Sequence, residues 1–288
     1  MEKKFLVGVD EVGIELIELF QQGKQNNEDL CEDMYVFNNQ FVAVIDGATN
    51  IWDRVIRGKS PGRFAAEVIK QSIEQIENER CTLEELIENI NKDLQQAYQE
   101  NGILEEIKHN RTLAPTASLV VYSHYHQEIW QIGDCQAMID GKLFINEKEL
   151  DSITANARSL FLEAELKKGK TVEDLLVEDS GWDYIKPLIQ QQYYLQNDPE
   201  SQYGFEVIDG FEVALSKVKK IKVPSNVKEM VLASDGYPYL KPTLQESEDS
   251  LQDLLKTDPL CFQQYKCTKG LRKGNVSFDD RLYIRFGV

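Results

Sequence analysis

The sequence is poor in the residues that build soft-metal and redox sites. Its 288 residues contain only three histidines, and its five cysteines (residues 31, 81, 135, 261 and 267) form no Cys-x-x-Cys pair. A zinc ribbon and a thioredoxin-like site are therefore excluded. His124 and His126 share one face of a strand-like segment, but no third histidine or cysteine lies nearby, which favours an exposed strand face. Any metal site must use oxygen ligands.

Basic side chains are also scarce. The chain has 32 Lys and Arg against 49 Asp and Glu, a net charge of −17. Proteins that bind nucleic acid neutralise phosphates with clustered basic residues, so we expect no nucleic-acid partner. The one basic cluster, SKVKKIK at residues 216–222, is typical of a solvated strand edge.

Long apolar runs are missing as well. No stretch approaches the roughly 20 apolar residues that a membrane span needs. The amino-terminal segment MEKKFLVGVDEVG turns acidic before an apolar region develops, which argues against a signal peptide. We therefore expect a cytoplasmic protein with no membrane partner. With 42% hydrophobic residues, it can build a core without disulfides or a structural metal.

Two amphipathic helices are predicted, at residues 61–79 and 81–101. Thr82 and Glu85 have capping-box spacing at the start of the second helix. Residues 150–200 are helical and polar, and another mainly helical stretch covers residues 243–269.

Apolar, strand-like segments surround these helices. Asp140-Gly141 lies between two alternating segments and predicts a hairpin turn. The strand-like segments are FVAVI, ASLVVYS, EIWQIG, CQAMI, KLFI, FEVAL, MVLAS and RLYIRFG. There is no internal repeat and no long linker. This order predicts one α+β domain of antiparallel sheets over residues 1–288.

Acidic residues stand where apolar strands end. They are Asp46 after FVAVI, Asp134 after WQIG, Asp235 after MVLAS, Asp279 before RLYIRF, and Glu32-Asp33 before MYVF. Any one of them is typical of a solvated turn. Together, on rigid strand ends, they would repel one another unless divalent cations lay between them. Mg²⁺ and Mn²⁺ prefer oxygen ligands, and an ion pair can hold a hydroxide and bind phosphoryl oxygens. The joint pattern therefore predicts a di-metal carboxylate site.

Seven segments in order resemble the motifs of the metal-dependent serine/threonine protein phosphatases of type 2C. They run from about residue 24 to the end: NNEDLCEDMYVF, FVAVIDGAT, GRFAAEVI, APTASLVVY, WQIGDCQAMIDGKL, MVLASDGY and FDDRLYI. The resemblance implies a four-layer α-β-β-α sandwich of two antiparallel sheets flanked by helices. It also implies Mg²⁺- or Mn²⁺-dependent removal of phosphate from phosphoserine or phosphothreonine by a metal-activated hydroxide. Residues from about 150 to 205 would form the family's flap.

The family's site residues carry over by position. Asp46 resembles the acid that bridges both metals, and the Gly47 carbonyl resembles a ligand of the second. Asp235 and Asp279 resemble the other acids of the first metal, so Asp46, Asp235 and Asp279 are the implied catalytic carboxylates. Glu32 resembles the side-chain ligand of the second metal, and Asp33 the acid that orients a water. Asp134, with Asp235, resembles the pair that holds a third metal.

The amino-terminal acidic pair has a rival in Glu28-Asp29, which matches the family tripeptide more literally. We prefer Glu32-Asp33. A tight hairpin then places Asp33 and Asp46 at one end of adjacent strands.

The chain departs from the family at several positions. Glu28 stands where an arginine usually binds the substrate phosphate. Candidate substitutes are Lys24, Arg54, Arg57 and Arg63. Ala48 replaces the histidine of animal members, and Asp280 replaces an asparagine.

No departure removes a metal ligand, so an active enzyme with a phosphoprotein substrate is favoured. The alternatives are a catalytically weak or inactive phosphatase-like binding domain and an unrelated two-metal hydrolase.

Overall fold

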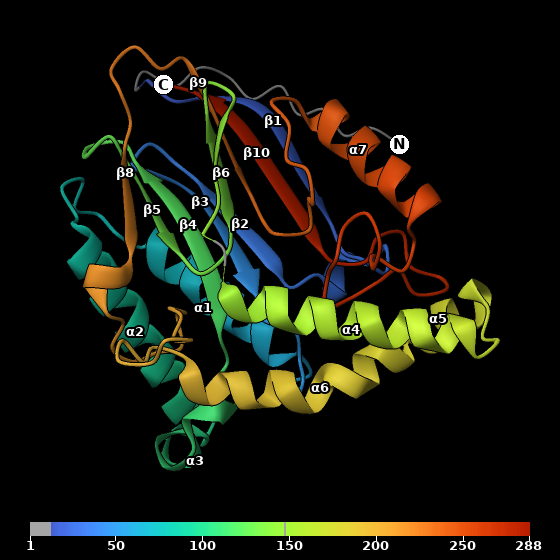
Figure 1. Ribbon diagram of the computed structural model, residues 1–288. Helices are drawn as coiled ribbons and strands as arrows, with labels where there is room; N and C mark the ends of the chain where they lie inside the picture. Colours follow the sequence, from blue (N-terminus) through green and yellow to red (C-terminus); the bar gives the residue numbers. More distant parts are fainter. Residues whose placement is uncertain (1–12, 147) are drawn as a thin grey trace.

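The computed structural model describes residues 13–146 and 148–288, which build two five-stranded antiparallel sheets (Figure 1). The first sheet has the order β1-β10-β9-β6-β7 and the second β2-β3-β4-β5-β8. The strands of the first are β1 Glu15–Gln22, β6 Gln136–Ile139, β7 Lys142–Phe144, β9 Glu229–Ala233 and β10 Arg281–Gly287. Those of the second are β2 Asp33–Phe37, β3 Phe41–Gly47, β4 Ala117–Ser123, β5 Glu128–Ile132 and β8 Lys219–Lys222.

Helices cover the outer faces of the sheets and one of their ends. The helices are α1 Pro61–Glu74, α2 Leu83–Glu100, α3 Leu104–His109, α4 Glu149–Lys167, α5 Val172–Val177, α6 Ser180–Gln192 and α7 Leu244–Thr257. Helices α1 and α2 lie against the second sheet, and α7 lies over the first (Figure 1). Helices α4 and α6 run side by side across one end of the sheets (Figure 1).

Two apolar layers join the sheets to each other and to helices α1 and α2. Side chains from β3, β4, β9 and β10 fill the space between the sheets, among them Val42, Val44, Val120, Leu232, Leu282 and Ile284. The inner stripes of α1 and α2 pack on the other face of the second sheet. Burying one such isoleucine or leucine stabilises the fold by roughly 1.5–3 kcal/mol. The predicted four-layer α-β-β-α sandwich is confirmed.

Local signals place the first two helices. Ser60 caps α1 by accepting a hydrogen bond from the backbone N–H of Arg63, and Pro61 follows at the first helical position. The capping box of Thr82 and Glu85 is present at the start of α2. Helix α1 ends at Glu74, before the expected residue 79, because the chain turns ahead of the Thr82 cap.

Other expectations need correction. Strand β1 was not predicted; it is an edge strand paired with β10, and its acids interrupt the apolar alternation. Helix α4 begins at Glu149 and is longer than its apolar pattern indicates. The stretch 243–269 is helical only as far as Thr257. Beyond it, the Asp258 carboxylate accepts hydrogen bonds from the backbone N–H groups of residues 262–265, which bends the chain into a loop.

The expectation about the first residues of the chain concerns residues 1–12, which lie outside the described residues. Within residues 13–146 and 148–288, no helix is long and apolar enough to cross a bilayer. All five cysteines belong to the described part of the chain, and each is a free thiol.

Candidate active site

The hairpin of β2 and β3 brings two acids face to face. Asp33 pairs directly with Asp46 in the antiparallel register. Like charges in directly opposed positions destabilise a sheet unless something offsets them. The rival acids, Glu28 and Asp29, lie exposed in the 3₁₀ turn that precedes β2.

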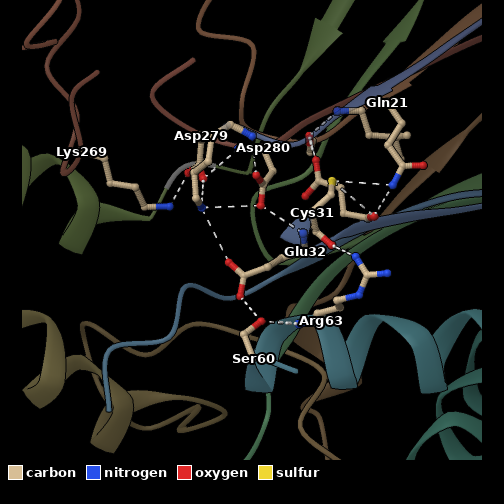
Figure 2. Close-up of polar contacts among 12 residues, drawn as sticks. Gln21, Cys31, Glu32, Ser60, Arg63, Lys269, Asp279 and Asp280 are labelled. Carbon is tan, nitrogen blue, oxygen red and sulfur yellow. Dashed lines mark hydrogen bonds and ion pairs between the residues drawn. The ribbon is translucent and has the colours of Figure 1, made fainter. Parts of the chain in front are cut away.

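Glycine at position 47 allows the start of α1 to approach the end of β3. A Cβ at Gly47 would lie 2.4 Å from the carbonyl oxygen of Gly62 and 2.8 Å from that of Glu32. The N–H of Gly47 donates to the Glu32 carbonyl at 3.2 Å. Ser60 donates a hydrogen bond to the Glu32 carboxylate (Figure 2). Glu32 is thus held beside a helix amino terminus, where the helix dipole favours negative charge.

The first sheet contributes its acids from the turns next to β9 and β10. Ser234, buried after β9, donates to the Asp33 carboxylate at 2.7 Å and accepts from the N–H of Leu282 at 2.9 Å. This serine connects the acids of one sheet to the backbone of the other. Asp235 follows it directly, and Asp279 stands two residues before β10.

Asp280 holds the amino-terminal segment in place. Its two carboxylate oxygens accept hydrogen bonds from the backbone N–H of Lys24 at 2.7 Å and of Glu32 at 3.0 Å (Figure 2). The sequence marked Asp280 only as a departure from the family asparagine. Its role was missed, because the two segments that it joins are about 250 positions apart in the chain.

Asp134 lies between a serine and a lysine. Ser118 donates to one of its oxygens at 2.5 Å, and Lys148, just before α4, donates to the other at 2.6 Å. Lys148 therefore connects the start of the α4–α6 segment to the carboxylates.

Lys24 and Lys269 contact the acids next to β10. The Lys24 ammonium lies 3.0 Å from Asp279, 3.5 Å from Asp280 and 3.7 Å from Glu32. Lys269 donates to the other oxygen of Asp279 (Figure 2). Sequence reasoning named Lys24 but missed Lys148 and Lys269, because a single lysine in a polar stretch carries no local signal.

Burial and neighbouring charges shift the pKa values of these acids. Burial, and then the charges of Asp235 and Asp33, raises the pKa of Asp46 well above its usual range. Burial, and then Asp279 and Asp134, raises the pKa of Asp235 to about 7.

Asp279 differs from these two acids. Burial alone would raise its pKa, but Lys24 and Lys269 outweigh burial and hold it below the usual value. Asp33, Asp46 and Asp235, whose pKa values burial and neighbouring acids raise, lack the positive charge that Asp279 has.

The residues present fit divalent cations in their chemistry. All the side-chain donors are hard oxygen ligands, as Mg²⁺ and Mn²⁺ prefer. Among residues 13–146 and 148–288, no three His, Cys, Asp or Glu side chains are already gathered closely enough to hold a metal ion. The carboxylates repel one another because their charges have the same sign. Asp134 and Asp279 are turned toward lysines instead of toward the other acids. Binding would require them to turn back toward a shared ion.

The predicted phosphate-binding residues lie in different surroundings. Lys24 is among the carboxylates. Arg54 forms an ion pair with Glu106 at 2.7 Å, and Arg57 is exposed in the turn after Ile56. Arg63 donates to the backbone carbonyl of Cys31 at 2.9 Å, which fixes the segment before β2 (Figure 2).

A cavity in the described part of the protein does not include these acids. It measures about 720 Å³ and lies between α4 and the loop after α7. None of the predicted site residues lines it. The carboxylates lie instead at the ends of the sheets. Metal ions and a water molecule are small, so a metal site there would need no large cavity.

No protein-family model matches the chain, and no curated protein matches it. Solved structures do. The serine/threonine phosphatase Stp1 from Staphylococcus aureus shares 15% identity over 99% of each chain, with a TM-score of 0.50. The serine/threonine phosphatase PstP/Ppp from Mycobacterium tuberculosis shares 14% identity over 96% of this chain and 99% of its own, with a TM-score of 0.49. The PstP catalytic domain in complex with 2 manganese ions has a TM-score of 0.48 at 13% identity over the same shares. The chain has the fold that its motifs imply.

Proposed function

We propose that the protein is a Mg²⁺- or Mn²⁺-dependent phosphomonoesterase that acts on phosphoserine or phosphothreonine in proteins. The observation that carries this proposal is that acids from both sheets approach one another at one end of the sandwich. Asp33 pairs with Asp46, Ser234, the neighbour of Asp235, donates to Asp33, and the Lys24 ammonium lies within 3.7 Å of both Glu32 and Asp279. The fold shared with a bacterial serine/threonine phosphatase supports it.

The charge balance supports a two-ion centre. Seven strand-end carboxylates (Glu32, Asp33, Asp46, Asp134, Asp235, Asp279 and Asp280) lie near three lysines (Lys24, Lys148 and Lys269). Full ionisation would leave a negative excess of at least four charges, which two divalent cations would offset. Such an excess in a partly buried site is otherwise costly.

The proposed metal ligands are those that the resemblance to the type 2C phosphatases implies. Asp46, Asp235 and Asp279 would hold the first ion, and Asp46, the Gly47 carbonyl and Glu32 the second. Asp134 and Asp235 would hold a third. When bound, the ions supply an activated water for attack on phosphorus and positive charge for the phosphoryl oxygens. Asp33, which accepts a hydrogen bond from Ser234, would orient the attacking water.

Lys24 is the phosphate-binding residue that the geometry favours. Its ammonium lies among the catalytic acids, whereas Arg54 is paired with Glu106 and Arg63 binds backbone carbonyls. A lysine binds phosphate as a compact charge and lacks the two-pronged geometry of arginine. Substrate binding should therefore be weak and sensitive to salt.

The α4–α6 segment is proposed to act as the flap of a single catalytic domain. Its first residues approach the acids through Lys148 and Asp134. Helices α4 and α6 pack on each other, so the segment can move as a unit. The free thiols fit a reducing compartment.

The test is hydrolysis of an aryl phosphate and of a phosphothreonine peptide, with and without Mn²⁺. We expect turnover only with Mn²⁺, and its loss in Asp235→Asn. Turnover that persists in a chelator would contradict the proposal.

A non-catalytic binding domain is the second candidate, since lysines already contact Asp134 and Asp279. Calorimetry that detects phosphopeptide binding, together with no release of phosphate under any metal, would favour it.

A further inference from the structure

We propose that Lys269 is a built-in counter-ion of the carboxylate cluster, which a divalent cation must displace from Asp279 before the metal centre can form. Lys269 would then set the metal concentration at which the protein becomes loaded. This inference depends on the proposed two-ion function and adds a residue that controls loading.

Both oxygens of Asp279 are already bound by ammonium groups. Lys269 donates to one of them (Figure 2). The Lys24 ammonium lies 3.0 Å from the other. Asp279 is also the proposed ligand of the first ion. An ion bound to either oxygen would lie close to an ammonium group of the same charge sign, and the two would repel each other. We therefore expect the arriving ion to displace the ammonium group from the oxygen that it binds.

Lys269 faces the remaining acids of the first ion as well. Asp279, Asp235 and Asp46 are the carboxylates that act most strongly on its charge. These are the three acids proposed to hold that ion. Lys24 instead lies toward Asp279, Asp280 and Glu32. Lys269 therefore faces all three acids proposed for the first ion, whereas Lys24 contacts only Asp279 among them.

A dedicated loop places Lys269. Residues 258–271 close on themselves, with hydrogen bonds from the N–H of Cys267 to the Cys261 carbonyl at 3.0 Å and from the N–H of Leu271 to the Pro259 carbonyl at 2.8 Å. Lys269 is 24% exposed, so it is no solvated surface lysine.

Arg158 anchors that loop to α4. Its side chain is wholly buried, forms an ion pair with Asp179 at 2.6 Å, and donates to the carbonyls of Leu260 and Cys267 at 2.8 and 3.0 Å. A Cβ at Gly270, the residue after Lys269, would lie 2.7 Å from the Arg158 guanidinium. The loop and the α4–α6 segment thus fix Lys269 jointly.

The experiment is calorimetric titration of Mn²⁺ into the metal-free full chain. Wild type is compared with Lys269→Met, which keeps the length of the side chain and removes the charge. Lys266→Met is the matched control: Lys266 is exposed in the same loop and bonds Asn156. Lys269→Arg keeps the positive charge. Melting temperatures in chelator are measured alongside.

We expect Lys269→Met to bind Mn²⁺ about tenfold more tightly or better, because a unit charge a few ångströms from the ion is removed. The metal-free variant should melt at a lower temperature, since its acids lose a partner. Lys266→Met and Lys269→Arg should behave as wild type in both measurements.

Equal Mn²⁺ affinity in wild type and Lys269→Met would overturn the inference and leave the proposed function standing. A failure of both proteins to bind Mn²⁺ would instead contradict the proposed function. A raised KM for phosphopeptide with unchanged Mn²⁺ affinity would assign Lys269 to phosphate binding and also overturn the inference.

If the variant is folded only with metal, it is loaded first and the release of Mn²⁺ into excess chelator is timed. Slower release than wild type is expected. Release at the wild-type rate would refute the proposed role.

Discussion

Two of the four Asp-Gly pairs in the chain, Asp140-Gly141 and Asp46-Gly47, stand at the ends of strands of similar apolar character. Asp140-Gly141 connects β6 to β7 with φ values of 46° and 77°, and a Cβ at Gly141 would meet no atom within 4 Å. Asp46-Gly47 ends β3, and a Cβ at Gly47 would collide with the Gly62 carbonyl. The first glycine is needed for its backbone angle and the second for its lack of volume. The dipeptide is the same, but the fold brings only Asp46 beside other acids, and only Asp46 is a proposed metal ligand.

The two Asp-Gly pairs should differ most when their aspartates are substituted. Asp46→Asn is expected to lower Mn²⁺-dependent turnover of an aryl phosphate about a thousandfold, equivalent to ~4 kcal/mol, because the proposed ligand of both ions would be lost. Asp140→Asn should leave turnover within about a factor of two, since asparagine also suits a type I′ turn. Comparable losses in both variants would refute the distinction.

The two glycines should differ in stability. Gly47→Ala is expected to cost about 2–4 kcal/mol, since the Cβ would force β3 away from α1. Gly141→Ala should cost only about 1–2 kcal/mol, from its positive φ. Denaturant unfolding of the metal-free variants measures both costs. A larger cost at Gly141 would contradict the close packing seen at Gly47.

A third Asp-Gly pair, Asp235-Gly236, is expected to make Mn²⁺ affinity depend on pH. Because the pKa of Asp235 is raised to about 7, a bound ion must displace a proton below that pH. Mn²⁺ affinity should rise by up to about tenfold per pH unit until pH 7 and then level off. Calorimetry in buffers of different ionisation enthalpy would detect the released proton.

The same raised pKa predicts the opposite trend for the metal-free fold. The folded protein retains a proton that the unfolded chain loses near pH 4, so stability should fall as pH rises from about 4 to 7. Saturating Mn²⁺ should remove this fall. Metal-free melting temperatures that rise over that range would contradict it.

The smallest effect is expected at Asp280, an acid that is not followed by a glycine. Asp280→Asn leaves only one oxygen to accept the two backbone N–H groups of Lys24 and Glu32. We expect the free energy of unfolding to fall by about 1–2 kcal/mol. We also expect KM to change more than kcat. A stability equal to wild type would show that asparagine serves equally well here.

Much of the fold could be predicted from the sequence because its signals are local. The Thr82–Glu85 capping box, the inner stripes of α1 and α2, and the Asp140-Gly141 hairpin depend on residues within a few positions of one another. Strand β1 could not be predicted, because its place at an edge permits acids in its pattern and its stability comes from β10. The loop after α7 was mistaken for helix because Asp258 ends the helix through side-chain bonds that no periodicity shows.

The sequence by itself determined which strands end in acidic residues. It therefore also determined that a metal site here would use hard oxygen ligands. Only the tertiary structure decided which acids meet one another and which meet lysines. Lys24 and Asp279 are 255 positions apart, and Lys269 reaches Asp279 only through a loop anchored on the buried Arg158. Charge pairing depends on distance in space, and at such separations along the chain only packing sets that distance.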